Sequence, residues 1–591
     1  MPHARSTRRR LALTICAVLA VVGIFVVKLV DIQVVRASEL TAAAESRREI
    51  SVTTYGTRGS IVDANGVVLA DSVERFDITA SPRNIGTTTS MTVNGVRTEV
   101  ATSDVFAKIA ELTGAVPADL STSISEALAV NPESDFTYLV KHVTLAQFQS
   151  VSALQIPWLY VELHPSRSYP SGATAGNLVG FIGTDGPLAG TEYQQNTCLA
   201  ATNGSSTYER SEDGVRLPGS TVVSEQPVNG GTVHLTIDSD LNWFAQQALA
   251  TQGQAVGADW GTAMVVRVST GEIVAAADWP SIDPNNLNSV SAADSGARSF
   301  TAPFEPGSIM KPVAFAALLD QGLITPSTQV VVPSAYRDGL PAGTSITDVW
   351  SHGDLRLTAT GILMNSSNIG TVMLSEQLTE QQKHDYFTAF GFGTPTAAGF
   401  LGEEAGDVQG AATIDSISQR TQMFGQGITV TSAQMLGLYQ TLGNGGVRLP
   451  LTLVSGCEHP DGSWSDVPVE TGTRVVSEYA ANTTLQMMET VASQGALRNV
   501  ISIPGYRIAA KTGTAEVAAN GGYGADRIVS LAGVFPADHP EYAMVVTFAK
   551  PDTIKSSAAA APAYHAIMEQ VIKTFRVTPS TETAPSLPLT W

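Results

Sequence analysis

Three short strings carry residues whose types and spacing suit acyl transfer. The first, Ser308-Ile-Met-Lys311, places a hydroxyl and an amine three residues apart, which puts both on one face of a helix. A serine hydroxyl is a weak nucleophile until a neighbouring base takes its proton. A lysine can act as that base only when it is neutral, which burial in the apolar stretch 312–319 favours. We therefore predict Ser308 as the nucleophile and Lys311 as the base.

The second string, Ser366-Ser-Asn368, offers another hydroxyl and an amide. Ser366 could relay a proton, and Asn368 could orient the lysine or a substrate carbonyl. Taken alone, these residues fit a helix cap equally well, because Ser and Asn are favoured there.

The third string is Lys511-Thr-Gly-Thr514, at the end of an expected strand. Lys511, Thr512 and Thr514 can hold a carboxylate together, and Gly513 lets a ligand backbone approach closely. A backbone N–H near Thr514 could also stabilise an oxyanion. The order of the three strings and their placement on suitable elements favour one composite acyl-transfer site.

The elements around these strings predict a mixed α/β (α+β) catalytic domain over residues 236–577. Strands are expected near both of its sequence ends, and apolar helices lie between them. Such an order implies one central antiparallel sheet that is built from both ends and packed by helices. The expected strands are 232–237, 262–268, 272–277, 507–514, 528–535 and 542–548, and the expected helices are 241–251, 308–321, 357–364, 369–378, 432–442, 478–492 and 558–575.

The N-terminus predicts a membrane anchor. An arginine-rich tail, residues 1–10, precedes a run of apolar residues, and residues 11–30 are long enough to cross a bilayer if Lys28 snorkels. The arginines place this tail in the cytoplasm and the rest of the chain outside. A cleaved signal peptide is the competing interpretation, but the run is long for its apolar region.

Two further regions complete the expected organisation. Residues 31–235 read as an extended, β-rich N-terminal module, with a hairpin at Asn65-Gly66 and a helix at 102–113. Residues 578–591, rich in Pro, Thr and Ser, are expected to be disordered.

Composition excludes several classes of function. The formal charge of −20 argues against nucleic-acid binding, which needs a basic face. Three cysteines and nine histidines show no metal-ligand spacing, so neither a metal nor another cofactor is predicted. Cys198 and Cys457 could pair in an exported chain, but sequence separation does not decide this.

The motif set resembles that of penicillin-binding proteins and class A β-lactamases. A wider resemblance to class B penicillin-binding proteins, which are membrane-anchored D,D-transpeptidases, covers roughly residues 10–575. It rests on strings such as Arg58-Gly-Ser-Ile-Val-Asp63, Arg167-Ser-Tyr-Pro170, Gly190-Thr-Glu192 and Gly425-Gln-Gly-Ile428. Phe304 stands where many relatives have Tyr, a mild departure.

The resemblance implies a function and a role for each site residue. Ser308 would be acylated by the penultimate D-Ala of a stem peptide, or by a β-lactam, with Lys311 as base and Ser366 and Asn368 as relay and orienter. Lys511, Thr512, Gly513 and Thr514 would bind the substrate. The short tail, single anchor and long N-module look most like the division-type (FtsI-like) septal enzyme, whose implied partner is a SEDS-type glycosyltransferase (FtsW-like).

Alternatives remain open at this point. An elongation-type class B enzyme shares the motifs, and a sensor or division scaffold could bind β-lactams without turnover. A class A β-lactamase would leave the N-module unexplained. A bifunctional class A protein would need a glycosyltransferase string before residue 235 that the chain lacks.

Overall fold

The computed structural model describes residues 3–41, 49–183, 186–209, 219–288, 290–291, 294–469, 471–519 and 522–591. The chain divides into two compact units, Met1–Thr57 with Ala201–Asn229, and Arg58–Ala200 with Gly230–Trp591. The first two residues of the expected cytoplasmic tail lie outside the described part.

The first unit contains the N-terminal helix and a small sheet. Helix α1 (His3–Val30) continues into a π-helical turn, η1 (Asp31–Val35). The stretch Arg8–Val35 is apolar and long enough to cross a membrane, and it is not buried against other parts of the protein. Lys28 pairs with Asp31 at 3.0 Å. The antiparallel sheet has the order β1 (Glu49–Thr54), β12 (Gly204–Glu209), β13 (Val222–Glu225).

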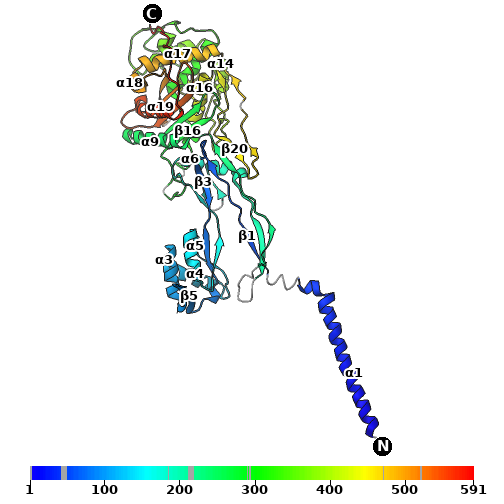
Figure 1. Cartoon of the computed structure of the whole chain (residues 1–591). Helices are drawn as coiled ribbons and strands as arrows, with labels where there is room; N and C mark the ends of the chain where they lie inside the picture. The colour runs from blue at the N-terminus through cyan, green and yellow to red at the C-terminus, as the bar shows by residue number, and fades with distance from the viewer. Residues whose placement is uncertain are drawn as a thin grey trace. The chain divides into compact units, whose positions relative to one another are not determined.

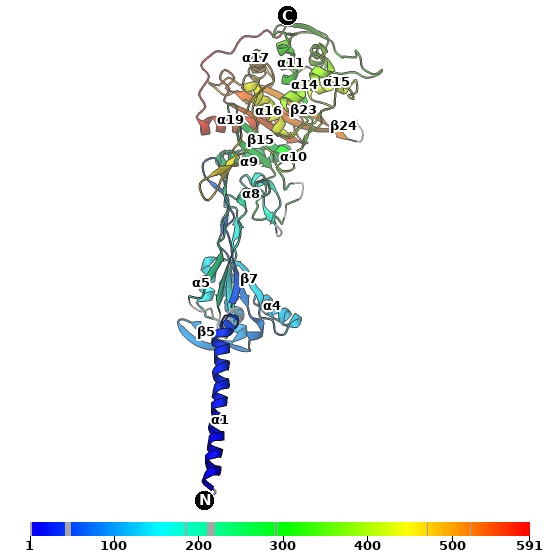
Figure 2. The same ribbon diagram turned by 90° about the vertical axis from the view of Figure 1, so that its right-hand side faces the viewer.

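The second unit is organised around a five-stranded antiparallel sheet with the order β16-β15-β25-β24-β23 (Figures 1 and 2). The fold prediction is confirmed here, since two of these strands precede the helical region and three follow it. Their bounds are β15 (Trp260–Arg267), β16 (Ile273–Trp279), β23 (Ala509–Ala519), β24 (Gly522–Phe535) and β25 (Tyr542–Ala549).

Side-chain alternation along the strands divides the core into two layers. In β15, Ala263 and Val265 pack with helices α9 (Ser239–Val256) and α19 (Ala561–Phe575). Met264 and Val266 point the other way, into the core that includes α11 (Lys311–Asp320) and α16 (Ser432–Gly443). A period of two residues therefore gives the sheet two apolar faces, each covered by helices.

Further helices complete the catalytic half. They are α10 (Arg298–Thr301), α12 (Ala359–Asn365), α13 (Asn368–Ser375), α14 (Glu380–Phe390), α15 (Ser418–Thr421), α17 (Glu478–Gln494) and α18 (Arg498–Ile501), with 3-10 turns η3 (Gly307–Met310), η4 (Gln422–Phe424) and η5 (Ser557–Ala559). Two-stranded sheets join β17 (Gln329–Val332) to β18 (Leu355–Thr358), and β19 (Val447–Arg448) to β22 (Thr473–Arg474).

A six-stranded sheet is built from three strands that precede residue 230 in the sequence and three that follow it. Its order is β21-β20-β14-β2-β3-β9, with β2 (Ile61–Val62), β3 (Val68–Val73), β9 (Ser166–Ser168), β14 (Thr232–Leu235), β20 (Val454–Glu458) and β21 (Trp464–Ser465). Glu192 is fully buried, and its carboxylate accepts hydrogen bonds from Arg58 Nε at 2.8 Å and from Arg167 Nε, in β9, at 2.6 Å. The strings that contain these three residues thus form one buried ion-pair cluster.

The rest of this part of the chain forms smaller elements. A three-stranded sheet has the order β7 (Thr137–Val143), β4 (Phe76–Ala80), β8 (Leu159–Leu163), and packs with α3 (Thr102–Thr113), α4 (Pro117–Val130) and α5 (Leu145–Ser152). The others are β5 (Thr88–Val93), β6 (Val96–Ala101), β10 (Ile182–Gly183), β11 (Gly186–Pro187), α6 (Gly176–Val179), α7 (Gly190–Gln194), α8 (Asn196–Leu199) and η2 (Pro82–Asn84).

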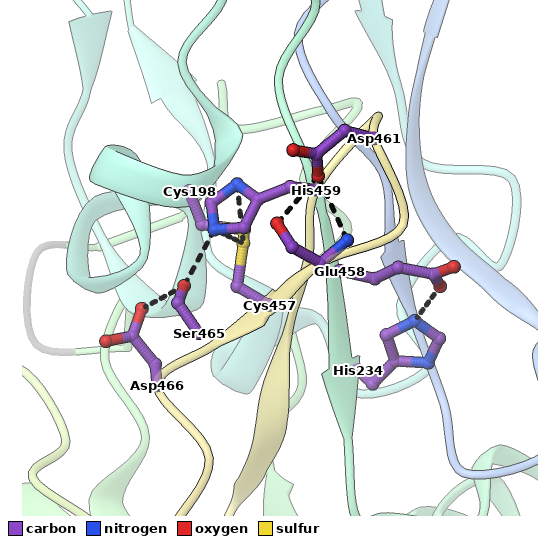
Figure 3. Close-up of a disulfide and its surroundings, with 9 residues drawn as sticks. Cys198, His234, Cys457, Glu458, His459, Asp461, Ser465 and Asp466 are labelled. Atoms are coloured by element: carbon purple, nitrogen blue, oxygen red, sulfur yellow. Dashed lines mark hydrogen bonds and ion pairs between the residues drawn. A yellow bond between two sulfur atoms is a disulfide. The ribbon is translucent and has the colours of Figure 1, made fainter.

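A disulfide joins Cys198, in α8, to Cys457, in β20, with the two Cα atoms 6.1 Å apart (Figure 3). The sequence left this pairing open. Gly231 lies against it, because a Cβ there would stand 2.9 Å from Cys457 Sγ and 3.1 Å from Cys198 Sγ. The ring of His459 lies against the disulfide, with its Nε2 3.9 Å from Cys457 Sγ. The same nitrogen lies 2.9 Å from Ser465 Oγ, which holds the ring in place.

One prediction is wrong. The sequence predicts a disordered segment at 578–591, whereas these residues have defined contacts with the catalytic half. Ser580 Oγ donates to Asp538 at 2.7 Å, and Thr358 N donates to Leu589 O at 3.0 Å. Composition measures only the apolar area a segment can bury, and these contacts are hydrogen bonds of backbone and side-chain groups to partners far away in the sequence.

Candidate active site

Ser308 and Lys311 lie where a tight turn enters helix α11. Ser308 is in the 3-10 turn η3, and Lys311 is the first residue of α11, so the hydroxyl precedes the helix that the sequence expected to begin at 308. Gly307 has φ +57°, and a Cβ there would stand 2.7 Å from Thr514 O. This glycine lets the turn press against β23, the edge strand of the central sheet.

The second string forms the break between two helices. Ser366 caps the C-terminal end of α12 in a left-handed conformation, φ +57°, and Ser367 caps the N-terminus of α13 by accepting from Gly370 N. A non-glycine residue holds this conformation only where its surroundings fix it. The turn directs both the hydroxyl and the carbonyl of Ser366 toward the lysine side chains.

Lys311 is fully buried, and its amine contacts three oxygens of the second string. Its Nζ lies 2.5 Å from Ser366 O, 2.8 Å from Asn368 Oδ1 and 3.2 Å from Ser366 Oγ. The carbonyl and the amide oxygen are acceptors only, so they take two amine protons. The contact with the Ser366 hydroxyl can run in either direction, and it runs toward Lys311 when the amine is neutral.

Lys511 reaches the same hydroxyl from the third string. Its Nζ lies 2.8 Å from Ser366 Oγ and 3.0 Å from Thr512 O, and its side chain is fully buried. Thr512 and Thr514 are partly exposed on the same strand, whereas Gly513 is buried and would bring a Cβ within 2.9 Å of Ile309 Cγ2. Both lysines therefore lie beneath a surface formed by hydroxyl-bearing residues.

Burial changes the titration of both lysines. Burial lowers the pKa of Lys511 to about 7. The pKa of Lys311 is held well below its usual range, first by burial and then by the charge of Lys511, while Asp348 acts in the opposite direction. A neutral amine at Lys311 near physiological pH is what a general base requires.

No sequence motif indicated Asp348. This buried carboxylate accepts from Asn368 N at 2.6 Å, Ile369 N at 3.0 Å and Ser367 Oγ at 2.7 Å. His352 Nε2 lies 3.0 Å from the same carboxylate, and its Nδ1 lies 2.5 Å from Gly353 O. Asp348 therefore fixes the start of α13 and the position of Asn368, although no motif marks a loop residue 18 positions before Ser366.

Glu305 supports the turn before Ser308. Its Oε1 accepts from Gly427 N at 2.9 Å and from Tyr523 OH at 3.0 Å, and burial raises the pKa of its carboxyl. Gly425, from the same string as Gly427, has φ +88°, and a Cβ there would stand 2.1 Å from Gly307 O. The Gly425–Ile428 string thus packs directly against the turn that holds Ser308.

The structure brings Lys311, Lys511 and the second string together, but it gives Ser308 no fixed partner. Ser308 is partly exposed, and within the described residues its hydroxyl makes no hydrogen bond. The turn that holds Ser308 leads directly into Lys311 and lies against the strand that carries Lys511. Nowhere in the described ranges do three or more His, Cys, Asp or Glu side chains gather as metal ligands would.

Two family descriptions match the chain. "Penicillin binding protein transpeptidase domain" matches residues 261–569, and "Penicillin-binding Protein dimerisation domain" matches residues 53–187. The first range contains all three strings, and the second contains the Arg58 and Arg167 strings.

Curated relatives and solved structures agree with these matches. The chain is 32% identical to penicillin-binding protein PbpB of Mycobacterium tuberculosis, over 94% of this chain and 84% of that protein. It is 30% identical to peptidoglycan D,D-transpeptidase FtsI of Escherichia coli, over 98% and 94%. A peptidoglycan synthetase from Bifidobacterium adolescentis is 30% identical with a TM-score of 0.72, over 92% of this chain and 100% of that one.

A further solved structure is penicillin-binding protein 3 of Mycobacterium tuberculosis in complex with aztreonam. The two sequences are 27% identical, and the structures superpose with a TM-score of 0.69 over 91% of this chain and 100% of that one. The fold, the order of the three strings and these relatives agree: the chain belongs to the class B penicillin-binding proteins, as a homologue of the septal D,D-transpeptidases PbpB and FtsI.

Proposed function

We propose that this protein cross-links peptidoglycan stem peptides at the septum through an acyl-serine at Ser308, and that β-lactams acylate the same residue. One observation carries the proposal. Two buried lysines with lowered pKa values converge on one hydroxyl, that of Ser366, directly beside the turn that presents Ser308. Burying two amines together disfavours their charged forms, which a lysine with a purely structural role would not require.

In the acylation step, Ser308 Oγ attacks the carbonyl carbon of the penultimate D-Ala, and its proton passes to Lys311 Nζ. Ser366 can accept a proton from one lysine while it donates its own, because both amines lie within 3.2 Å of its hydroxyl. A proton delivered to the peptide nitrogen lets the C–N bond break, which releases the terminal D-Ala and leaves an ester on Ser308.

In the second step an amine from a neighbouring stem peptide attacks the ester. The amine loses a proton to Lys311, the new amide bond forms, and Ser308 leaves and regains its proton. Water in place of the amine would give the carboxypeptidase outcome, with a free carboxylate. We assign Asn368 to hold Lys311 in place, since its Oδ1 accepts from Nζ at 2.8 Å.

The third string would bind the substrate along the edge of the sheet. Thr512 and Thr514 are half-exposed on β23 and could donate to the carboxylate of the stem peptide or β-lactam, with Lys511 adding charge from below. Gly513 keeps the strand close to the Ser308 turn. Backbone N–H groups at the Ser308 turn and near Thr514 would stabilise the oxyanion.

The disulfide supports an extracytoplasmic catalytic half. Disulfides persist in oxidising compartments and are rare in the cytosol, and Cys198–Cys457 lies beyond the apolar helix. With the arginine-rich tail, this supports a cytoplasmic N-terminus, an anchor at 11–30, an N-terminal module at 31–235 and a catalytic domain at 236–577. An FtsW-like SEDS glycosyltransferase in the same membrane is the partner we propose.

Labelling of the full chain in detergent by a fluorescent penicillin tests the proposal. Wild type should acquire a stable covalent label, and Ser308→Ala should acquire none. Ser327→Ala, at an exposed serine in the loop after α11, is the matched control and should label as wild type does. Equal labelling of Ser308→Ala and wild type would refute the nucleophile, and rapid loss of the label would indicate a β-lactamase instead.

A further inference from the structure

The segment after helix α19 is anchored to the catalytic domain at two places. At the first, Ser580 N donates to Gly505 O at 2.9 Å and Ser580 Oγ accepts from Arg507 N at 2.8 Å. The second anchor is formed by residues 587–591, which we call the strap. The trace between α19 and the strap runs along the outside of the domain (Figure 2).

The strap binds the end of strand β18 and the residue that caps α12. Thr358 N donates to Leu589 O at 3.0 Å, and Thr358 Oγ1 donates to Pro588 O at 2.5 Å. Leu357 and Thr590 form a single antiparallel bridge, so the strap pairs with the edge of the β17–β18 sheet at one position. The guanidinium of Arg356 lies 4.9 Å from the centre of the Trp591 ring.

Helix α12 is shaped to receive the strap. A Cβ on Gly361 would stand 1.9 Å from Leu589 O, so no other residue fits there while the strap is bound. Gly361 N also donates to Thr358 Oγ1 at 3.0 Å, which caps the helix. The same threonine hydroxyl thus joins the helix N-terminus to the strap.

The opposite end of this helix carries Ser366. Seven residues at 1.5 Å each place the two ends about 10 Å apart. So short a helix has few internal hydrogen bonds, and its two terminal turns meet. A shift at its N-terminus therefore moves Ser366, whose hydroxyl must lie within reach of both lysines.

We propose that the strap is a positioning segment for the reaction: it fixes α12 so that the Ser366 hydroxyl lies between Lys311 and Lys511. The proposal rests on the acyl-serine function given above. It makes residues 587–591 part of what sets the acylation rate, although none of them touches the substrate or the reacting atoms.

Single-turnover acylation of the full chain in detergent tests this role. A fluorescent penicillin gives separately its binding constant Kd and the acylation rate constant k2. A variant that ends after residue 586 should lose about tenfold in k2, which corresponds to about 1.4 kcal/mol in the activation free energy. Its Kd should not change, because the third string lies on another element. The peptide Leu-Pro-Leu-Thr-Trp, added at millimolar concentration, should restore k2.

A double-mutant cycle separates positioning from general damage. Gly361→Ala should lower k2 in the full chain, because the new methyl group displaces Leu589. In the variant without the strap, Gly361→Ala should have no further effect on k2, since nothing remains to displace. Gly437→Ala, in α16 with only Leu451 at 3.9 Å, is the matched helical control and should leave k2 unchanged.

Three outcomes would overturn the proposal. They are an unchanged k2 in the strap-less variant, a loss of labelled fraction at unchanged k2, which means partial unfolding, and equal effects of Gly361→Ala with and without the strap. If wild type itself is not acylated, the proposed function fails and this proposal fails with it. If wild type is acylated and only these comparisons fail, the proposed function stands.

Discussion

Replacing Asp348 by Asn should destabilise the protein and yet move its acylation profile toward acid. In the wild type, Oδ1 of Asp348 accepts from Asn368 N and Ile369 N, while Oδ2 accepts from Ser367 Oγ and faces His352 Nε2. The amide of Asn keeps one oxygen and replaces the other by a donor. The two contacts at the substituted oxygen therefore lose their acceptor. The two contacts at the remaining oxygen keep an acceptor, but that acceptor is no longer charged.

The magnitude follows from the strength of these bonds. A hydrogen bond to a charged group contributes about 1.5–3 kcal/mol, and a neutral one about 1 kcal/mol. The Ser367 hydroxyl and the His352 ring can reverse their roles toward the new amide, which limits the loss. We expect about 2 kcal/mol of lost stability, or a fall in Tm of about 3 °C for a domain of this size.

The effect on Lys311 has the opposite sense. The charge of Asp348 raises the pKa of Lys311 against the larger effect of burial, so its removal lowers that pKa further. Acylation needs the neutral amine and declines as pH falls through this pKa. The acid limb of the profile should therefore move to lower pH, and the ratio of variant to wild-type rates should rise as pH falls.

The assay is the acylation rate of the full chain by a fluorescent penicillin across ~pH 5 to 9, with thermal unfolding in parallel. Asp354→Asn is the matched control, because Asp354 is exposed in the same loop. It should change neither Tm nor the profile. An acid limb that stays in place or moves to higher pH in Asp348→Asn would refute the electrostatic link between Asp348 and Lys311.

Three other predictions concern buried charges and the disulfide. Burial lowers the pKa of Lys511 from 10.5 to about 7, so between these pH values the unfolded chain binds a proton that the folded chain does not. The free energy of unfolding should therefore rise with pH in this range, by about 1.4 kcal/mol per pH unit from this lysine. Lys511→Met should remove that contribution when unfolding is followed by denaturant titration. Burial raises the pKa of Asp278 from 3.8 to about 7, so its contribution to stability is present below 3.8 and lost as pH rises to 7; Asp278→Asn should be more stable than wild type at pH 8, and equal stability would contradict the burial argument. Cys198 and Cys457 close a separation of 259 residues, for which the loop-entropy relation gives about 5.6 kcal/mol of stabilisation. Reductant should therefore lower the Tm of wild type but not that of the double Ser variant.

Much of the fold could be predicted from local patterns. The helix expected at 102–113 is α3, Thr102–Thr113, and the strands expected at 528–535 and 542–548 fall within β24 and β25. These elements have apolar periodicity that their own residues specify, and α3 ends at a glycine, Gly114. The antiparallel central sheet followed from their order along the chain.

The positions of the candidate site residues could be predicted only in part. The sequence assigned Lys311 and Lys511 to separate roles, whereas the structure has both within reach of Ser366 Oγ. It gave no indication of Asp348, because a loop carboxylate acquires its role from the backbone N–H groups it meets after folding. These groups belong to a helix that begins 20 residues later.

The sequence by itself determined the three strings, their order, the apolar N-terminus and the class of protein, since each depends on residue types at short spacing. Tertiary structure decided the Cys198–Cys457 pair, the lowered pKa values of the two lysines and the docking of residues 587–591. Each of these depends on burial or on a partner far away in sequence. Desolvation and hydrogen bonding depend on neighbours in space and not in sequence. The composition of the strap predicts disorder because it carries no information about the end of β18, to which the strap binds in the folded protein.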